Sequence, residues 1–208
     1  MKSSTQRATA RTMAVAAALT VGLAMGTSVS LAGVDSSSSI LDHQQRTVEA
    51  ILSDTHVSFV PPLDGNPLSR EWFHDGRAAF RISGPDASSW SGHITMGYQV
   101  GYPATLDGRI KFQWWTPSLG LEIGNDPKID VNSLIPQLGL ELAVGFGPGI
   151  QTVEAAGGDI SGADGYIQMS GFHGTVTGVL GQTTIRPWVK IVSGNGDSVT
   201  TYGPLWTN

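Results

Sequence analysis

Two runs near the middle of the chain alternate apolar and polar residues with a period of two. In residues 109–114 the apolar positions are Ile110, Phe112 and Trp114. In residues 137–146 one face carries the larger apolar residues, which are Leu138, Leu140, Leu142, Val144 and Phe146. A period of two is typical of a strand whose two faces meet different surroundings. The segment between the runs, 122–133, is polar and rich in turn residues, so we expect the runs to be the arms of one long hairpin.

Each predicted arm is roughly 10–13 residues long, about the length that a tilted strand needs to cross a membrane. A soluble sheet with one buried face would show the same alternation, so the pattern alone leaves both interpretations open. After residue 33 no apolar run is long enough for a spanning helix, so any passage through a membrane has to be made by strands.

The first 32 residues have the features of a secretory signal peptide. Lys2, Arg7 and Arg11 form a basic start, residues 13–25 are apolar, and Ser30-Leu31-Ala32 is a small-residue cleavage site. The apolar stretch is shorter than the roughly 20 residues of a helical span. We therefore expect an exported protein whose mature chain is 33–208.

The composition of the mature chain excludes several classes of function. Nine basic residues stand against seventeen acidic ones, a net charge of −8, and phosphate binding needs a basic face, so nucleic acid is not expected as a partner. The absence of cysteine excludes disulfides, thiol chemistry and cysteine-ligated metals. The full sequence has 27 Gly and 11 Pro, nearly all of them after residue 32, where they lie between short apolar runs, so the mature chain is predicted to be all-β.

Turn signals divide the rest of the chain into short predicted strands. Residues 40–52 suit either an amphipathic helix or a strand, and 61–67 form a proline-rich loop. Turns are predicted at 84–86 and 194–197, and strands at 77–83, 92–100, 150–154, 166–170, 174–180, 184–192 and 198–202. The predicted layout is a β body made from both ends of the mature chain, with the hairpin inserted from its middle.

Five segments resemble one known family, the MspA-like porins of mycolic-acid-bearing actinobacteria. Residues 68–78 read LSREWFHDGRA, similar to the family's LTREWFHSGRA, and 97–103 read GYQVGYP, similar to its GYQIGFP. The other three are GPGI at 147–150, HGTVTG at 173–178 and GDSVTTYG at 196–203. The segments follow in one order from about residue 46 to residue 206, which is nearly the whole mature chain.

The resemblance implies a homo-octamer in the cell outer membrane, the mycolate layer of the envelope, with a homologous second subunit as a further possible partner. Each subunit would contribute a β-sandwich rim domain, from 33–103 and 147–208, and one hairpin, about 104–146 with its tip at 122–133, to a shared sixteen-stranded transmembrane β-barrel. The implied function is a water-filled channel for passive diffusion of small hydrophilic solutes and ions, with no cofactor and no enzymatic activity. A lone hairpin would leave backbone groups unpaired in lipid, so assembly follows from the hairpin itself, whereas the number eight comes only from the family.

The family also suggests which residues line the channel. In the family, a group of three acidic residues after the first barrel strand forms the constriction. When the sequences are aligned from Thr116-Pro117, Glu122 matches the first of these acids. Ile123 and Asn125 stand in place of the second and third. We therefore expect a cation-preferring constriction of net charge −2 per subunit, formed by Glu122, Asp126, Asp130 and Lys128. The channel wall is assigned to Asp107, Arg109, Lys111, Gln113 and Glu141, where Arg109 and Lys111 can meet Glu141 of the same chain or of a neighbouring subunit. The lipid face is assigned to Ile110, Phe112, Trp114, Leu138, Leu140, Leu142 and Val144.

Other kinds of site find little support in the sequence. The five histidines, His43, His56, His74, His93 and His173, show no zinc-binding spacing, and the G-x-S-x-G motif of hydrolases is absent. Gly196-Asp197-Ser198 is similar to an esterase nucleophile block, but a turn explains it. Trp72, Trp90, Trp188 and Trp206 are expected in the core rather than in a sugar platform. The alternative function is a secreted β-sandwich interaction protein, or a pore-forming toxin that contributes one hairpin per subunit.

Overall fold

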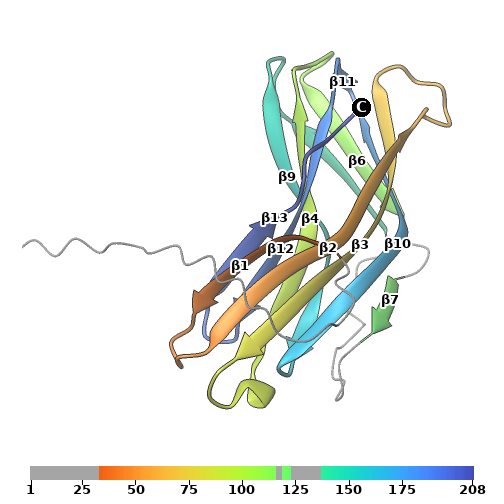
Figure 1. Ribbon diagram of the computed structural model, residues 1–208. Helices are drawn as coiled ribbons and strands as arrows, with labels where there is room; N and C mark the ends of the chain where they lie inside the picture. Colours follow the sequence, from red (N-terminus) through yellow and green to blue (C-terminus); the bar gives the residue numbers. More distant parts are fainter. Residues whose placement is uncertain (1–32, 116–118, 123–136) are drawn as a thin grey trace, which may run out of the picture. The chain divides into compact units, whose positions relative to one another are not determined.

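The computed structural model describes residues 33–115, 119–122 and 137–208, with the backbone alone for 114, 115, 119–122 and 137–139. Its strands form two antiparallel sheets and one short two-stranded ladder (Figure 1). The first sheet has the order β1-β2-β3-β10-β6-β8, and β7 also pairs with β10; the strands are β1 (Val34–Leu41), β2 (Thr47–Val60), β3 (Ser69–Ser83), β6 (Arg109–Trp115), β7 (Leu119–Glu122), β8 (Gln137–Ala143) and β10 (Asp164–Thr177). The all-β prediction is confirmed.

The second sheet has the order β13-β12-β4-β9, and β14 also pairs with β12. Its strands are β4 (Ser91–Tyr102), β9 (Gly149–Ser161), β12 (Thr184–Ser193), β13 (Ser198–Tyr202) and β14 (Trp206–Thr207). The short ladder joins β5 (Ala104–Thr105) to β11 (Val179–Leu180). No helix among the described residues has the length and apolar character to cross a membrane.

The ambiguous segment 40–52 folds as two strands joined by a tight turn. The Oδ1 atom of Asp42 accepts hydrogen bonds from the backbone N–H groups of Gln44 (2.8 Å) and Arg46 (2.9 Å), and Gln45 has a positive φ of 62°. The guanidinium of Arg46 donates to Oδ2 of Asp42 at 2.8 Å, and both side chains are buried. A side chain that satisfies turn N–H groups competes with helix formation, which explains why the hairpin forms here instead of a helix.

The predicted turns lie where strands end. Residues 84–86 lead from β3 into a single 3₁₀ turn, Ala87–Ser89, before β4. Residues 194–197 join β12 to β13, with Gly196 at φ 92° and the Asp197 N–H donating to Ser193 Oγ at 3.1 Å. The strands expected at 166–170 and 174–180 are largely one strand, β10, interrupted by a bulge at which Gly171 has φ 62°.

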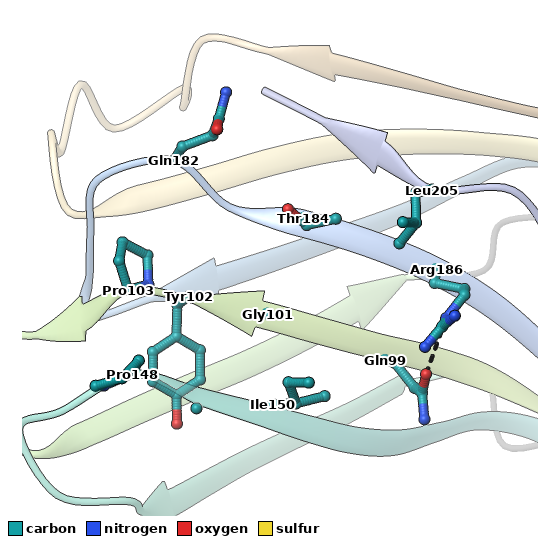
Figure 2. Close-up of a pocket in the computed structure, with 11 residues that line it drawn as sticks. Gln99, Gly101, Tyr102, Pro103, Pro148, Ile150, Gln182, Thr184, Arg186 and Leu205 are labelled. Atoms are coloured by element: carbon teal, nitrogen blue, oxygen red, sulfur yellow. Dashed lines mark hydrogen bonds between the residues drawn. The ribbon is translucent and has the colours of Figure 1, made fainter.

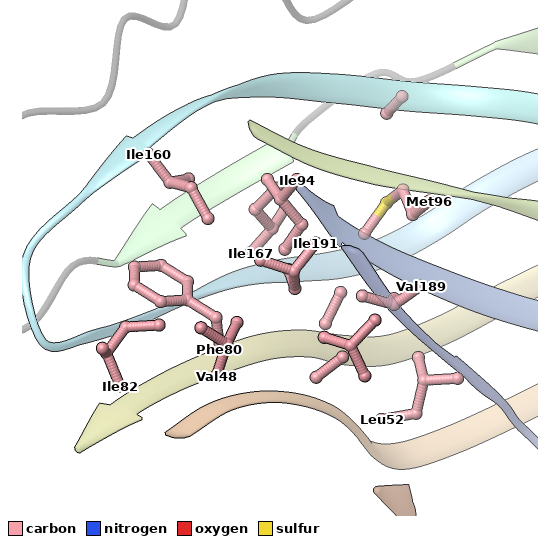
Figure 3. Close-up of a cluster of buried hydrophobic side chains, with 14 of the residues drawn as sticks. Val48, Leu52, Phe80, Ile82, Ile94, Met96, Ile160, Ile167, Val189 and Ile191 are labelled. Atoms are coloured by element: carbon pink, nitrogen blue, oxygen red, sulfur yellow. The ribbon is translucent and has the colours of Figure 1, made fainter. Parts of the chain in front are cut away.

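The core lies between the two sheets in two clusters. The first takes Val48, Phe80 and Ile167 from the first sheet and Ile94 and Val189 from the second (Figure 3). The second is richer in aromatic side chains, and includes Trp72, Tyr98, Tyr102, Phe112 and Phe172. The core prediction is confirmed for Trp72, Trp90 and Trp188, which are at most 5% exposed, while Trp206 packs against the margin of the second cluster.

Candidate functional site

The two alternating runs pair with each other, as the hairpin interpretation predicts. Strands β6 and β8 are antiparallel neighbours, in a register that runs from Arg109 opposite Ala143 to Trp115 opposite Gln137. On its other side β6 pairs with β10, so β8 is the last strand of the first sheet. Among the described residues, the outer edge of β8 therefore has unpaired backbone donors and acceptors.

The polar face of this hairpin carries a small charged network. Glu141 lies opposite Lys111, and its carboxylate is 3.3 Å from Arg109 Nη1 and 3.5 Å from Lys111 Nζ. Asp107 Oδ1 accepts a hydrogen bond from the Arg109 N–H at 3.1 Å, and Gln113 continues the same exposed face. The pairing of Arg109 and Lys111 with Glu141 is thus confirmed. Two cations and two carboxylates keep this face hydrated without net charge, and such exposed ion pairs add little stability.

The apolar face of β6 does not meet lipid at Ile110 and Phe112, and that assignment is wrong. Both side chains are 0% exposed and belong to the second core cluster. Leu140, Leu142 and Val144 of the other arm are partly buried against the same cluster. Alternation shows that one face needs apolar surroundings, but the chain's own second sheet supplies them here. The side chains of Trp114 and Leu138 lie outside the described residues.

The polar face extends from the hairpin onto the body of the first sheet. Gln113 is opposite Thr175 and Lys111 is opposite Thr177, while Thr175 is opposite Glu71 on its other side. Residues directly opposite in antiparallel strands project on the same face. Glu71, Thr175 and Thr177 therefore share the face of the predicted channel wall.

Glu71 lies in a cleft of about 400 Å³ on this face, which Leu63 and Gln113 also line. Its carboxylate accepts a hydrogen bond from the Leu63 N–H at 3.0 Å and lies 2.8 Å from Nε2 of His173, on which Phe73 stacks. This cleft could not be predicted from the sequence, because only the non-local pairing of β10 with β6 brings Glu71 and His173 beside the hairpin.

The predicted constriction lies mostly outside the described residues. Glu122 is the last residue of β7, where its backbone pairs with Tyr166 of β10, but its side chain is not described. Asp126, Lys128 and Asp130 fall in the segment that the structure does not describe.

His43 and His93 lie beside aspartates, and His74 is buried in the core. His43 pairs with Asp197, and His93 Nδ1 lies 2.7 Å from Asp159 Oδ1. His74 is 1% exposed between the sheets. Over the described ranges, no group of three or more His, Asp or Glu side chains is placed to hold a metal ion. Gly196-Asp197-Ser198 belongs to the β12–β13 turn, as expected.

Comparison with known proteins gives one consistent result. The sequence model of the MspA family matches residues 44–207. Porin MspC of Mycolicibacterium smegmatis is 40% identical over 197 residues, which cover 91% of this chain and 92% of that protein. Porin MspB is 39% identical over 194 residues, 90% of each chain. Porin MspA is 39% identical over 207 residues, 96% of this chain and 98% of the relative.

Proposed function

Because the chain belongs to the MspA family of porins, we propose that it is the subunit of an outer-membrane channel through which small hydrophilic solutes and ions diffuse passively. The family consists of channel proteins, and the chain is accordingly not an enzyme. Residues 1–32 would direct its export.

The observation that carries the proposal is the hairpin of β6 and β8 with its open outer edge. In lipid, each unpaired backbone N–H or C=O costs several kcal/mol, so an open edge can cross a membrane only inside a closed barrel. Among the described residues, the edge strand β8 pairs only with β6. Strands from other copies of the chain can supply the hydrogen-bond partners for its free backbone groups. Eight copies, as the resemblance implies, would give sixteen strands.

The polar face of the hairpin is assigned to the channel. Asp107, Arg109, Lys111, Gln113 and Glu141 are all exposed on this face, whereas Ile110 and Phe112 on the opposite face are sealed in the core. A hydrated wall with balanced charge lets ions of either sign pass. Lipid contact is assigned to the hairpin beyond residue 113, where Trp114 and Leu138 continue the apolar alternation.

Cation preference is assigned to the hairpin tip. Glu122, Asp126 and Asp130 against Lys128 give −2 per subunit. In a narrow constriction such charges, repeated around a ring, focus their field and enrich cations.

The mass and location of the native protein test the proposal. Detergent extracts of the producer's envelope should contain an oligomer whose mass is a whole multiple of the mature chain. A toxin or secreted interaction protein would instead be recovered as a stable soluble monomer from the medium. That recovery, with no protein in the envelope, would contradict the proposal.

A further inference from the structure

The cleft at Glu71 has the size of a small-molecule site. Its volume is about 400 Å³, which is within the range of ligand pockets. Three of its lining residues, Pro62, Leu63 and Asp64, come from the loop between β2 and β3, and the others belong to β3, β6 and β10. This loop and the strand face proposed to line the channel therefore form the Glu71 cleft together.

The Glu71 carboxylate has room for further hydrogen-bond donors. Glu71 is 9% exposed, and it lines the cleft. An ionised carboxylate offers about four acceptor positions. Two of them are used by the Leu63 N–H at 3.0 Å and by Nε2 of His173 at 2.8 Å. A ligand that enters the cleft with N–H groups can therefore donate to the same carboxylate.

The charges of the cleft favour a cation. Asp64 adds a second carboxylate, and among the described residues that line the cleft there is neither a lysine nor an arginine. Lys111 is opposite Thr177, but its ammonium group lies 3.5 Å from a carboxylate oxygen on β8. When His173 is neutral, its Nε2–H donates to Glu71 without adding positive charge. A nearly buried carboxylate is costly without a countercharge, so a cation that enters the cleft is stabilised.

The loop holds Asp64 in place before any ligand binds. Asp64 Oδ1 accepts a hydrogen bond from the Asn66 N–H at 3.0 Å, and the Gly65 N–H donates to the Pro62 carbonyl at 2.9 Å. These hydrogen bonds fix the turn locally. A site that is already ordered loses less conformational entropy on binding, so the second carboxylate is available at little cost.

Leu63 gives the cleft an apolar surface. Its side chain is 96% exposed, although its N–H is bonded to Glu71. Pro62, a second apolar residue of the same loop, also lines the cleft. Covering exposed apolar carbon with a hydrocarbon group is favourable. The cleft thus suits a ligand with a cationic end and a short hydrocarbon part.

The second sheet carries a groove of opposite character, with a volume of about 670 Å³. Figure 2 shows Arg186 in this groove, where its Nε donates to Gln99 Oε1 at 3.0 Å. Among the described residues that line the groove there is no aspartate or glutamate. An ammonium group should therefore prefer the Glu71 cleft to this larger groove.

We propose that the Glu71 cleft binds small organic ammonium ions, with the ammonium group on the carboxylates of Glu71 and Asp64 and the hydrocarbon part against Leu63. This inference rests on the proposed channel, because the cleft belongs to the face assigned to its wall. It names a class of solute that the channel would hold on its way through.

Binding to the unmodified protein is measured first. Saturation-transfer NMR on the detergent-solubilised oligomer, at about pH 8, where free histidine is neutral, compares butylammonium with butanol and with methylammonium. Butylammonium should bind at least about tenfold more tightly than butanol, because only the ammonium group donates charge-assisted hydrogen bonds. It should also bind severalfold more tightly than methylammonium, because its longer chain covers Leu63. Detergent micelles without protein give the background signal.

Substitutions then assign the site. Glu71→Gln should weaken butylammonium binding about tenfold. Asp64→Asn, which alters a more exposed carboxylate, should weaken it about two- to threefold. Leu63→Asn should remove the difference between butylammonium and methylammonium. The control Glu154→Gln removes one exposed carboxylate from β9 in the second sheet and should leave the affinity unchanged.

Equal binding of butylammonium and butanol would overturn the inference, and so would an unchanged affinity in a Glu71→Gln oligomer that is intact. If Glu71→Gln does not assemble, Asp64→Asn and Leu63→Asn decide the question, and unchanged binding in both would overturn the inference. Either result, in an oligomer that conducts ions, leaves the channel function standing. Binding as expected by an oligomer that passes no current would instead contradict the proposed function.

Discussion

His74 Nδ1 lies 2.7 Å from the hydroxyl oxygen of Tyr98, and this hydrogen bond joins β3 to β4 across the interior of the sandwich. Both side chains are at most 2% exposed, and Nε2 of His74 has no hydrogen-bond partner among the described residues. Burial lowers the pKa of His74 to about 4, against weaker opposing effects of Asp75 and Asp35 and a small contribution of His56 in the same direction.

The chain should therefore lose stability as the pH falls from about 6.5 toward 4. In this window the unfolded chain binds a proton at residue 74 and the folded chain does not, so acid favours unfolding, by up to about 3 kcal/mol. Denaturant unfolding across this range should show the loss, and His74→Gln should remove most of it. In His93→Gln, which alters a more exposed histidine, the loss should persist; an unchanged pH dependence in His74→Gln would contradict this account.

Two glycines of β4 should respond differently to alanine. A Cβ atom at Gly97 would lie 2.0 Å from the Val153 carbonyl oxygen and 2.7 Å from the Trp188 ring, whereas the nearest atoms to a Cβ at Gly101 are 3.9 Å away. Gly97→Ala should lower the free energy of unfolding by about 2 kcal/mol or more. Gly101→Ala should change it by no more than about 0.5 kcal/mol in urea unfolding. Equal effects of the two substitutions would contradict the close packing of the Trp188 ring against Gly97 of β4.

Glu141 should keep the channel wall from favouring anions. Glu141→Gln would leave Arg109 and Lys111, on the face proposed to line the channel, without their carboxylate, so reversal potentials at low salt should shift toward anion permeability. The shift should fade near 1 M salt, where the Debye length is about 3 Å. Glu49→Gln, which alters an ion pair with Arg81 on another part of the first sheet, should leave the selectivity unchanged.

Selectivity for cations should depend on the hairpin tip. Replacing Glu122, Asp126 and Asp130 together with Gln or Asn converts the tip from −2 to +1 per subunit, because Lys128 remains. The ratio of cation to anion permeability at low salt should fall while the oligomer stays intact. An unchanged ratio would place the selectivity elsewhere on the wall, at Asp107 and Glu141.

Sequence reasoning succeeded where the determinants are local. Alternation predicted the pairing of β6 with β8, and turn residues at 84–86 and 194–197 predicted where strands end. Residues 40–52, which suited either a helix or a strand, belong to two strands, because Asp42 caps a turn that divides the segment.

The alternation identified the apolar face of a strand correctly, but it did not predict which part of the protein or membrane that face contacts. Ile110 and Phe112 were correctly placed on an apolar face, but the surroundings of that face depend on β4 and β9, far away in the sequence. Likewise, Glu71 and His173 join the face of Gln113 only through the register of β10 with β3 and β6. A single sequence carries no direct signal for such non-local pairings.

Single-channel recording in a planar lipid bilayer tests the central claim most directly. The purified oligomer should insert and produce discrete, uniform current steps, because the proposed closed ring of identical hairpins would enclose one water-filled path of fixed width. Bilayers exposed to the detergent alone should show no current steps. An oligomer that never raises the bilayer current, or current steps that come only from a monomeric species, would contradict the account.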